Sequence, residues 1–218
     1  ALTIGRDDGD YLDAYGIEVA GEPAGSGRPW YAWRLYAEAQ RPLAVETDFS
    51  IRRLFDRDFA FRPNLPGDRA DQFGAALTLR VARGLDPKGF RWGAEADLGA
   101  ETGTYRFART AATLGASFPL TDRWHLSLES AAGITHGAAP IQAAWFLGGP
   151  ATLRGYAPLS AIGDSFWRTR SELSTSAALA RIGIFSDLGW AGPRESFGSG
   201  RPLLSAGAGA SLLDGLIR

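Results

Sequence analysis

Residues Phe90–Ala100 read FRWGAEADLGA, in which apolar side chains alternate with side chains that are charged or absent. Every even position is apolar, whereas the odd positions hold Arg, Gly, Glu or Asp. A period of two sends successive side chains to opposite faces of an extended strand. At roughly 3.3 Å per residue, a steeply tilted stretch of this length is about long enough to cross an outer membrane. The stretch therefore predicts a membrane-spanning strand with one lipid-facing side and one wet side.

The same alternation recurs along the chain. In Trp124–Ile134 the apolar side is broken only by Ser130, and other segments repeat the pattern more weakly. This alternation predicts ten strands. They are Leu12–Ala20, Trp30–Gln40, Val45–Phe55, Phe73–Val81, Phe90–Ala100, Tyr105–Phe118, Trp124–Ile134, Trp167–Leu179, Arg181–Trp190 and Leu203–Leu212.

The composition agrees with strands in a membrane. Apolar residues make up 45% of the chain and charged residues 22%, and mean hydropathy is −0.12, as expected when only one face of each strand is greasy. Charged residues or Gly interrupt every apolar run, so no transmembrane helix is available. A soluble β-sandwich also alternates, but its strands usually have about five or six residues. The sequence thus predicts an all-β, antiparallel transmembrane β-barrel.

The predicted connections alternate in length, as the two ends of an outer-membrane barrel require. Short turns are expected at Arg41–Ala44, Gly84–Gly89, Pro119–Arg123 and around Ala180. Longer loops are expected at Gly21–Pro29, Asp56–Ala70, Gly137–Gly163 and Ala191–Pro202. Four aromatic residues beside the short turns fit an interfacial girdle, namely Phe90, Trp92, Phe118 and Trp124.

Several function classes are disfavoured. A net charge of −1 offers no basic face for nucleic acid, and the lack of Cys removes disulfides and thiolate metal sites. Only His125 and His136 could serve as imidazole bases, and neither belongs to a zinc-protease, hydrolase or phosphate-loop motif. We therefore expect no catalytic residue, no metal, no cofactor and no small-molecule substrate.

The longest loop contains Trp145–Tyr156, WFLGGPATLRGY. It resembles the lumen-entering loop of the BamA, TamA and two-partner-secretion transporter superfamily, in which a Gly-Gly pair precedes an Arg-Gly-aromatic tripeptide. Downstream, GDSFWRTRSEL at 163–173 resembles the next strand of that superfamily, and IFSDLGW at 184–190 resembles the strand after it. The matching loop residues are Gly148, Gly149, Arg154, Gly155 and Tyr156.

Strand parity puts Glu172 and Asp187 on one wet wall, because each occupies a lumen-facing position of its strand. A guanidinium can form paired hydrogen bonds with a carboxylate. The resemblance implies that Arg154 docks on Asp187, with Glu172 nearby, and the alternative is an ordinary network of lumen charges. Gly155 would let the backbone turn at the loop tip, and Tyr156 would wedge against the wall.

The resemblance also implies location, organisation and function. It makes residues 1–218 part of a bacterial outer-membrane barrel that has about sixteen strands when complete. The first strands, the last strands and the periplasmic POTRA domains are expected to be absent from these residues. The expected function is outer-membrane protein assembly or polypeptide secretion, with membrane lipids and client polypeptides as partners. A passive pore is the alternative, and an enzyme borne on the barrel is less favoured.

Overall fold

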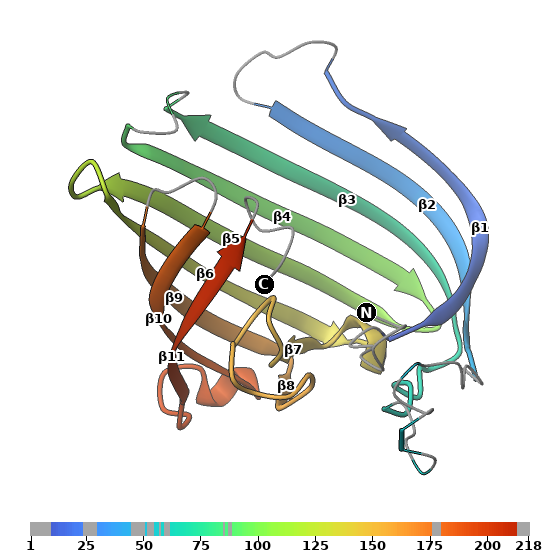
Figure 1. The fold of residues 1–218 in the computed structure, drawn as a ribbon. Helices are drawn as coiled ribbons and strands as arrows, with labels where there is room; N and C mark the ends of the chain where they lie inside the picture. The colour runs from blue at the N-terminus through green and yellow to red at the C-terminus, as the bar shows by residue number, and fades with distance from the viewer. Residues whose placement is uncertain are drawn as a thin grey trace.

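The computed structural model is built almost entirely from β-strands (Figure 1). It describes residues 10–23, 30–44, 51, 55–56, 58, 62–84, 86, 89–175 and 180–212. The long strands are β1 (Leu12–Gly21), β2 (Trp30–Pro42), β3 (Ala70–Arg83), β4 (Arg91–Gly103), β5 (Arg106–Pro119), β6 (Trp124–Ala138), β9 (Ser165–Thr175), β10 (Ala180–Gly192) and β11 (Leu203–Leu212). The short elements are η3 (Ile141–Ala143), β7 (Trp145–Leu147), β8 (Ala161–Gly163) and η4 (Arg194–Ser196).

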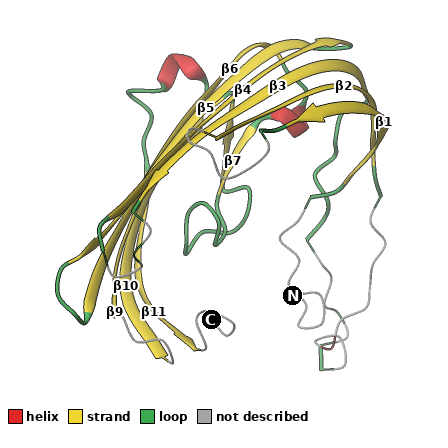
Figure 2. Ribbon diagram, turned by 90° about the horizontal axis from the view of Figure 1, so that it is seen from above, coloured by secondary structure: helices red, strands yellow, loops and turns green. Residues whose placement is uncertain are grey.

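The long strands form one nine-stranded antiparallel sheet in the order β1-β2-β3-β4-β5-β6-β9-β10-β11. The sheet curves into an open trough, and the segment that holds β7 lies on its concave side (Figure 2). Within the described residues the edge strands β1 and β11 do not pair with each other, so the trough is not closed. This architecture confirms the prediction of an all-β antiparallel barrel wall with a long loop inside it.

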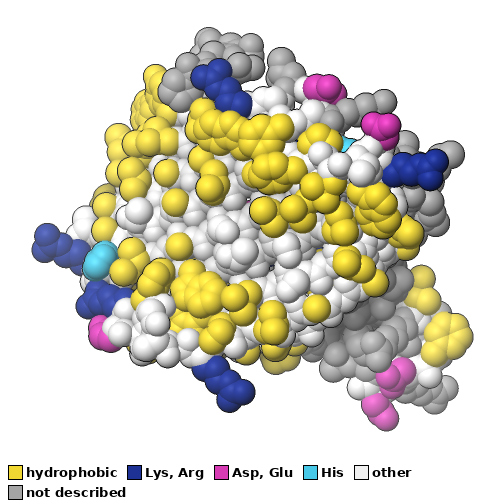
Figure 3. Space-filling view, turned by 90° about the vertical axis from the view of Figure 1, so that its left-hand side faces the viewer, with side chains coloured by type: hydrophobic (Ala, Val, Ile, Leu, Met, Phe, Trp, Pro, Cys, Tyr) yellow, Lys and Arg dark blue, Asp and Glu magenta, His cyan; other side chains and the backbone are white. Residues whose placement is uncertain are grey.

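The strand register separates the two faces as the alternation predicts. The convex face exposes large apolar side chains to an extent that would be unfavourable in water. They include Ile17 at 78%, Phe73 at 64% and Leu204 at 63%. Figure 3 shows apolar side chains gathered over this surface, with charged side chains at its margins. Exposed apolar area costs about 25 cal/mol per Å² in water, so this face requires a hydrocarbon environment.

The concave face is polar, and its charges are paired across neighbouring strands. The hydroxyl of Thr78 donates to Asp97 at 2.6 Å, and Arg80 on the same strand pairs with Glu95. Farther along the sheet, Arg168 Nη1 lies 2.5 Å from Glu129 Oε1. Cross-strand pairs of opposite charge stabilise a sheet and leave few free charges on the wall.

The predicted strand Val45–Phe55 lies mostly outside the described residues. Ile51 and Phe55, which are described, are not in a strand, and β2 pairs directly with β3, with Gln40 opposite Ala70. The long loop therefore follows the sixth strand of the sheet and not the seventh. Alternation could not reveal this, because it describes side chains and does not show which backbone edge is free to accept a strand.

The direct pairing of β2 with β3 also changes which connections share an end of the sheet. Because consecutive strands are antiparallel, residues 22–29 join β1 to β2 at the same end as the β3–β4 and β5–β6 connections. The prediction that the loop Gly21–Pro29 lies at the same end of the sheet as the other long loops was wrong. The connections 43–69, 139–164 and 193–202 share the other end.

The predicted aromatic girdle lies on the convex face near the short-turn end. Phe90 and Phe118 pack with ring centroids 4.9 Å apart, and Trp124 is 39% exposed. Aromatic rings are favoured at this depth because their apolar bodies and polar edges suit the interface. No helix among the described residues is long and apolar enough to span a membrane.

Two neighbouring residues of β3 test which face meets lipid. Leu77 is on the convex face midway along the strand, and Thr78 is on the concave face beside Asp97. We expect Leu77→Arg to destabilise the inserted protein by about 2–4 kcal/mol, because it places a cation in hydrocarbon. Thr78→Arg serves as the control and should cost little. Urea unfolding of the complete protein in vesicles measures both, and equal losses would contradict the assignment of the faces.

Candidate functional site: a loop fastened inside the trough

The loop between β6 and β9 packs on the concave wall through an apolar cluster. Leu147 and Leu153 are almost fully buried, with 1% and 0% exposure. They pack with Ala131 of β6 and Phe166 of β9, both of which face the concave side. Burying a leucine side chain contributes roughly 1.5–3 kcal/mol. The loop is thus held partly by the same effect that holds a soluble core.

Backbone geometry makes the loop tip compact. Gly148 has φ +124°, and a Cβ there would lie 2.0 Å from the carbonyl oxygen of Ala157. Its N–H donates to Thr152 Oγ1 at 2.8 Å, and the same hydroxyl donates back to the Gly148 carbonyl at 2.7 Å. Gly149 N–H donates to the carbonyl of Tyr156 at 2.9 Å. Only glycine fits position 148, for both steric and conformational reasons.

The last residues of the motif reach toward the far strands of the sheet. Gly155 has φ +86° and lies against Ser205 of β11. The hydroxyl of Tyr156 donates to the carbonyl oxygen of Leu204 at 3.0 Å. The tripeptide therefore brings the loop from β6 across to β11. The structure thus places Gly155 at a turn of the loop and Tyr156 against the wall at β11.

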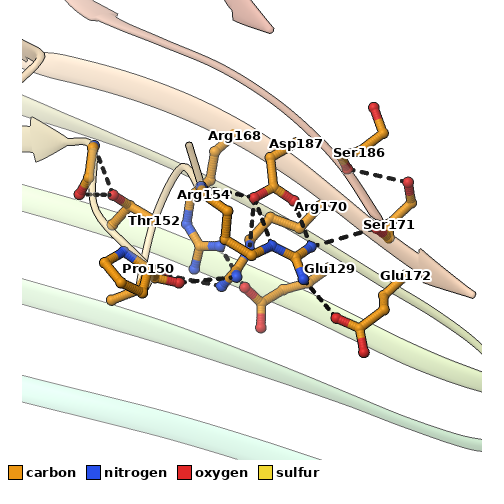
Figure 4. Close-up of polar contacts among 12 residues, drawn as sticks. Glu129, Pro150, Thr152, Arg154, Arg168, Arg170, Ser171, Glu172, Ser186 and Asp187 are labelled. Atoms are coloured by element: carbon orange, nitrogen blue, oxygen red, sulfur yellow. Dashed lines mark hydrogen bonds and ion pairs between the residues drawn. The ribbon is translucent and has the colours of Figure 1, made fainter. Parts of the chain in front are cut away.

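Arg154, the first residue of this tripeptide, contacts both predicted wall carboxylates (Figure 4). Its Nε donates to Asp187 Oδ2 at 2.8 Å and its Nη2 donates to Asp187 Oδ1 at 2.6 Å, a bidentate pair. The Arg154 backbone N–H also donates to Oδ2 at 2.9 Å. Nη1 donates to Glu172 Oε2 at 2.5 Å. The structure thus brings together three residues that are far apart in the sequence.

Burial makes the Asp187 contact the stronger of the two. The Asp187 side chain is 0% exposed, whereas that of Glu172 is 37% exposed and screened by solvent. Removing one partner of a buried ion pair costs about 3–5 kcal/mol, because the other charge is left without compensation. Hydrogen bonding to Asp187 raises the pKa of Arg154 above its ordinary value, so the guanidinium stays charged. It also lies 4.0 Å from the centre of the Phe185 ring.

A second arginine holds the tip and was not predicted to do so. Arg170 of β9 donates from Nη1 to the carbonyl of Ala151 at 3.0 Å and from Nη2 to that of Pro150 at 3.1 Å. Its Nε lies 3.7 Å from Asp187 Oδ2. Arg170 lies two residues before Glu172 on β9 and so faces the same wall, but carbonyl acceptors in a loop leave no mark in the sequence. The tip is therefore clamped through a side chain and through its backbone.

The base of the loop is fastened separately. Trp145 Nε1 donates to Thr135 Oγ1 at 3.0 Å, and Arg109 of β5 lies 4.1 Å from the centre of the Trp145 ring. In η3, Gln142 Nε2 donates to Gln40 Oε1 of β2 at 2.6 Å. These contacts were not predicted, because they join residues as many as 102 positions apart.

The two histidines lie on opposite faces of β6. His125 is 8% exposed on the concave side, and His136 is exposed on the convex side with Nδ1 3.4 Å from Arg194 Nη1. They therefore do not share a site.

Replacing Arg154 tests whether its ion pairs hold the loop. We expect Arg154→Ala to raise the rate of proteolytic cleavage within 145–156 about tenfold or more, because the tip loses its bidentate anchor and leaves Asp187 buried without a partner. The matched control is Arg168→Ala, which removes from the same wall an arginine that is hydrogen-bonded to Glu129 and not to the loop tip. The measurement is limited proteolysis of the folded complete protein. Equal cleavage of both variants would rule out a specific role for Arg154.

Comparison with known proteins supports the superfamily resemblance. CdiB from Acinetobacter baumannii has a similar fold, with a TM-score of 0.63 at 18% sequence identity, over 92% of this chain and 36% of that one. This chain thus spans about a third of the length of that structure. None of the curated proteins matches it. The family model for haemolysin secretion/activation proteins ShlB/FhaC/HecB matches residues 68–212, more than half of the chain and the whole of the loop and its wall. The chain therefore belongs to the haemolysin secretion/activation protein family ShlB/FhaC/HecB.

Proposed function

We propose that the protein exports a polypeptide partner across the bacterial outer membrane, as part of the barrel of a two-partner secretion transporter. The observation that carries the proposal is the fastening of the loop inside the trough, where Arg154 bridges Asp187 and Glu172. The family match supports secretion, since its description names secretion and activation of haemolysin. Outer-membrane protein assembly, the other activity expected from the sequence, belongs to the wider superfamily and is less favoured.

Residues 1–218 would form one part of a larger barrel domain in the outer membrane. The exposed apolar face of the sheet requires lipid, and the free edges of β1 and β11 would pair with further strands of the same barrel. About sixteen strands in all, together with periplasmic POTRA domains that receive the client, would complete the transporter. The 36% coverage of the CdiB chain agrees with this view.

Export would require the loop tip to leave its place. A chain passing through the lumen and the clamped tip compete for the same space on the concave side. Separating Arg154 from Asp187 in a dry site is costly. The cost falls if water enters as the loop withdraws, because a hydrated carboxylate no longer needs its arginine partner. The clamp would therefore hold the resting pore closed and release it only when a client competes for the lumen.

The wall itself suits an extended client. Several of its charges are already paired with one another, as in Arg168 with Glu129 and Arg80 with Glu95, so these positions offer a wet surface without strong attraction for a passing chain. A passing polypeptide can then be solvated along the way and released at the far end. No chemical step is needed.

A secretion assay tests the proposal. In cells that express the complete protein and its partner polypeptide, Arg154→Ala should lower the secreted amount about tenfold while the barrel stays inserted, as heat-modifiable gel migration shows. A loop tip that has lost its anchor on Asp187 takes up many positions in the lumen and obstructs the path that the client needs. Arg83→Ala, which removes an exposed arginine from the rim of the convex face, is the control and should secrete normally.

The outcome also separates secretion from a passive pore. Steady, ion-selective conductance of the complete protein in a planar bilayer, with secretion unaffected by Arg154→Ala, would favour a channel in which the loop is only a constriction. Low resting conductance that rises in Arg154→Ala would agree with a clamped transporter.

A further inference from the structure

A long groove crosses the convex face of the sheet. Its floor follows one row of residues paired across six strands, Glu18, Tyr36, Gly74, Glu101, Phe107 and Gly137. Side chains at these positions point to the concave face, so only their backbone lines the floor. The groove holds about 980 Å³, within the range of roughly 300–1,000 Å³ that ligand sites occupy.

The walls of the groove are two rows of outward side chains. One row runs Val19, Leu35, Ala75, Ala100, Ala108 and His136, and the other includes Ile17, Ala37, Phe73, Thr102 and Arg106. Three successive alanines, on β3, β4 and β5, make the first row low in its middle, between larger apolar residues at β1 and β2 and His136 at β6. A slender apolar chain therefore fits this channel better than a flat or globular ligand would.

Cations lie only at one end of the groove. Arg106 is exposed, and its guanidinium forms no hydrogen bond or ion pair with any residue that the structure describes. His136 is its diagonal neighbour, since Ala108 pairs with His136 and Arg106 pairs with Ala138. Arg194 of η4 adds a second guanidinium, with Nη1 3.4 Å from His136 Nδ1 and Nε 3.3 Å from Glu195. This end is therefore complementary to an anion.

The position of this end of the groove in the membrane follows from the connections. Arg106 begins β5 and His136 is near the end of β6, at the end of the sheet that carries the long connections 43–69, 139–164 and 193–202. Outer-membrane barrels place their longer loops outside the cell. On the proposed location, the cationic end faces the outer surface, and the groove leads from it across the lipid-facing wall to the middle of β1.

We propose that this groove binds an anionic lipid of the outer leaflet, with a headgroup phosphate at Arg106, His136 and Arg194 and an acyl chain over the alanines. The guanidinium of Arg106 supplies charge-assisted hydrogen bonds to phosphate oxygens. The apolar channel supplies contact along the chain. The lipid would tie β1 to β6 on the outside, opposite the wall that faces the loop. The site is separate from the export path.

A second groove on the same face provides an internal comparison. It holds about 570 Å³ along the row Arg80, Glu95, Thr113, Ala131 and Arg168. The charged members of that row face the concave side, where they pair with one another or with Glu129. Its outward walls, such as Ala96, Ala112 and Trp167, carry no cation. This groove can hold an acyl chain but offers nothing to a phosphate.

The test measures lipid retention by the purified complete protein in detergent, using native mass spectrometry with bisphosphorylated lipid A as the probe and phosphatidylethanolamine as the zwitterionic reference. We expect Arg106→Gln to weaken lipid A binding about tenfold, as the loss of a charge-assisted contact predicts, and to leave the reference lipid unchanged. Ala100→Phe, which fills the channel, should weaken lipid A binding to a similar extent.

Two matched controls decide between this site and general attraction of lipid to the surface. Arg83→Gln removes an exposed arginine at the opposite rim of the sheet, and Ala112→Phe fills the second groove. Both should retain lipid A like the unmodified protein. Equal losses in the controls, or unchanged binding in Arg106→Gln and Ala100→Phe, would overturn the proposal. Secretion is expected to persist in all four variants at saturating lipid, so a failure of the transport proposal would be seen separately.

Discussion

A buried carboxylate governs the arrangement of this protein. Asp187 is fully buried on the concave wall, and a charge in that position is tolerated only when it is paired and fully hydrogen-bonded. Arg154 supplies two side-chain bonds and one backbone bond to it. Because Arg154 comes from a loop, satisfying Asp187 fixes the loop inside the trough. With the loop in that position, Arg170 binds the backbone of its tip and Leu153 packs in the apolar cluster. Tyr156 then contacts β11.

The second constraint is the alternation of side chains along every strand. It divides one sheet into an apolar surface that requires lipid and a polar surface whose charges pair across strands. The strands whose inward side chains pair Glu129 with Arg168 inside the trough also carry rows of small outward residues on the other side. The proposed export path and the proposed lipid groove are thus two faces of the same strands. Because neighbouring residues of a strand face opposite sides, a substitution at one position can test the export path and a substitution at the next can test the lipid groove.

Much of the fold could be predicted, because period two needs no knowledge of partners. The stretch around Glu95 and the strand holding Asp187 were assigned to the correct faces. Alternation alone cannot predict which strands pair. A strand at Val45–Phe55 was expected beside β2, but β3 occupies that edge of β2. The contact of Gln142 with Gln40 was also beyond prediction, because a hydrogen bond between two polar residues in distant segments leaves no periodic signal.

The sequence alone determined which side chains face lipid and which face water, and it marked Arg154, Glu172 and Asp187 through their resemblance to a known loop and wall. Only the tertiary structure decided that the loop follows the sixth strand, that Arg170 holds its backbone, and that Arg106 lies beside His136 at the end of a groove. The physical reason is that alternation is a local property of the chain. Strand register, burial and loop contacts depend instead on which distant backbone edges and side chains meet.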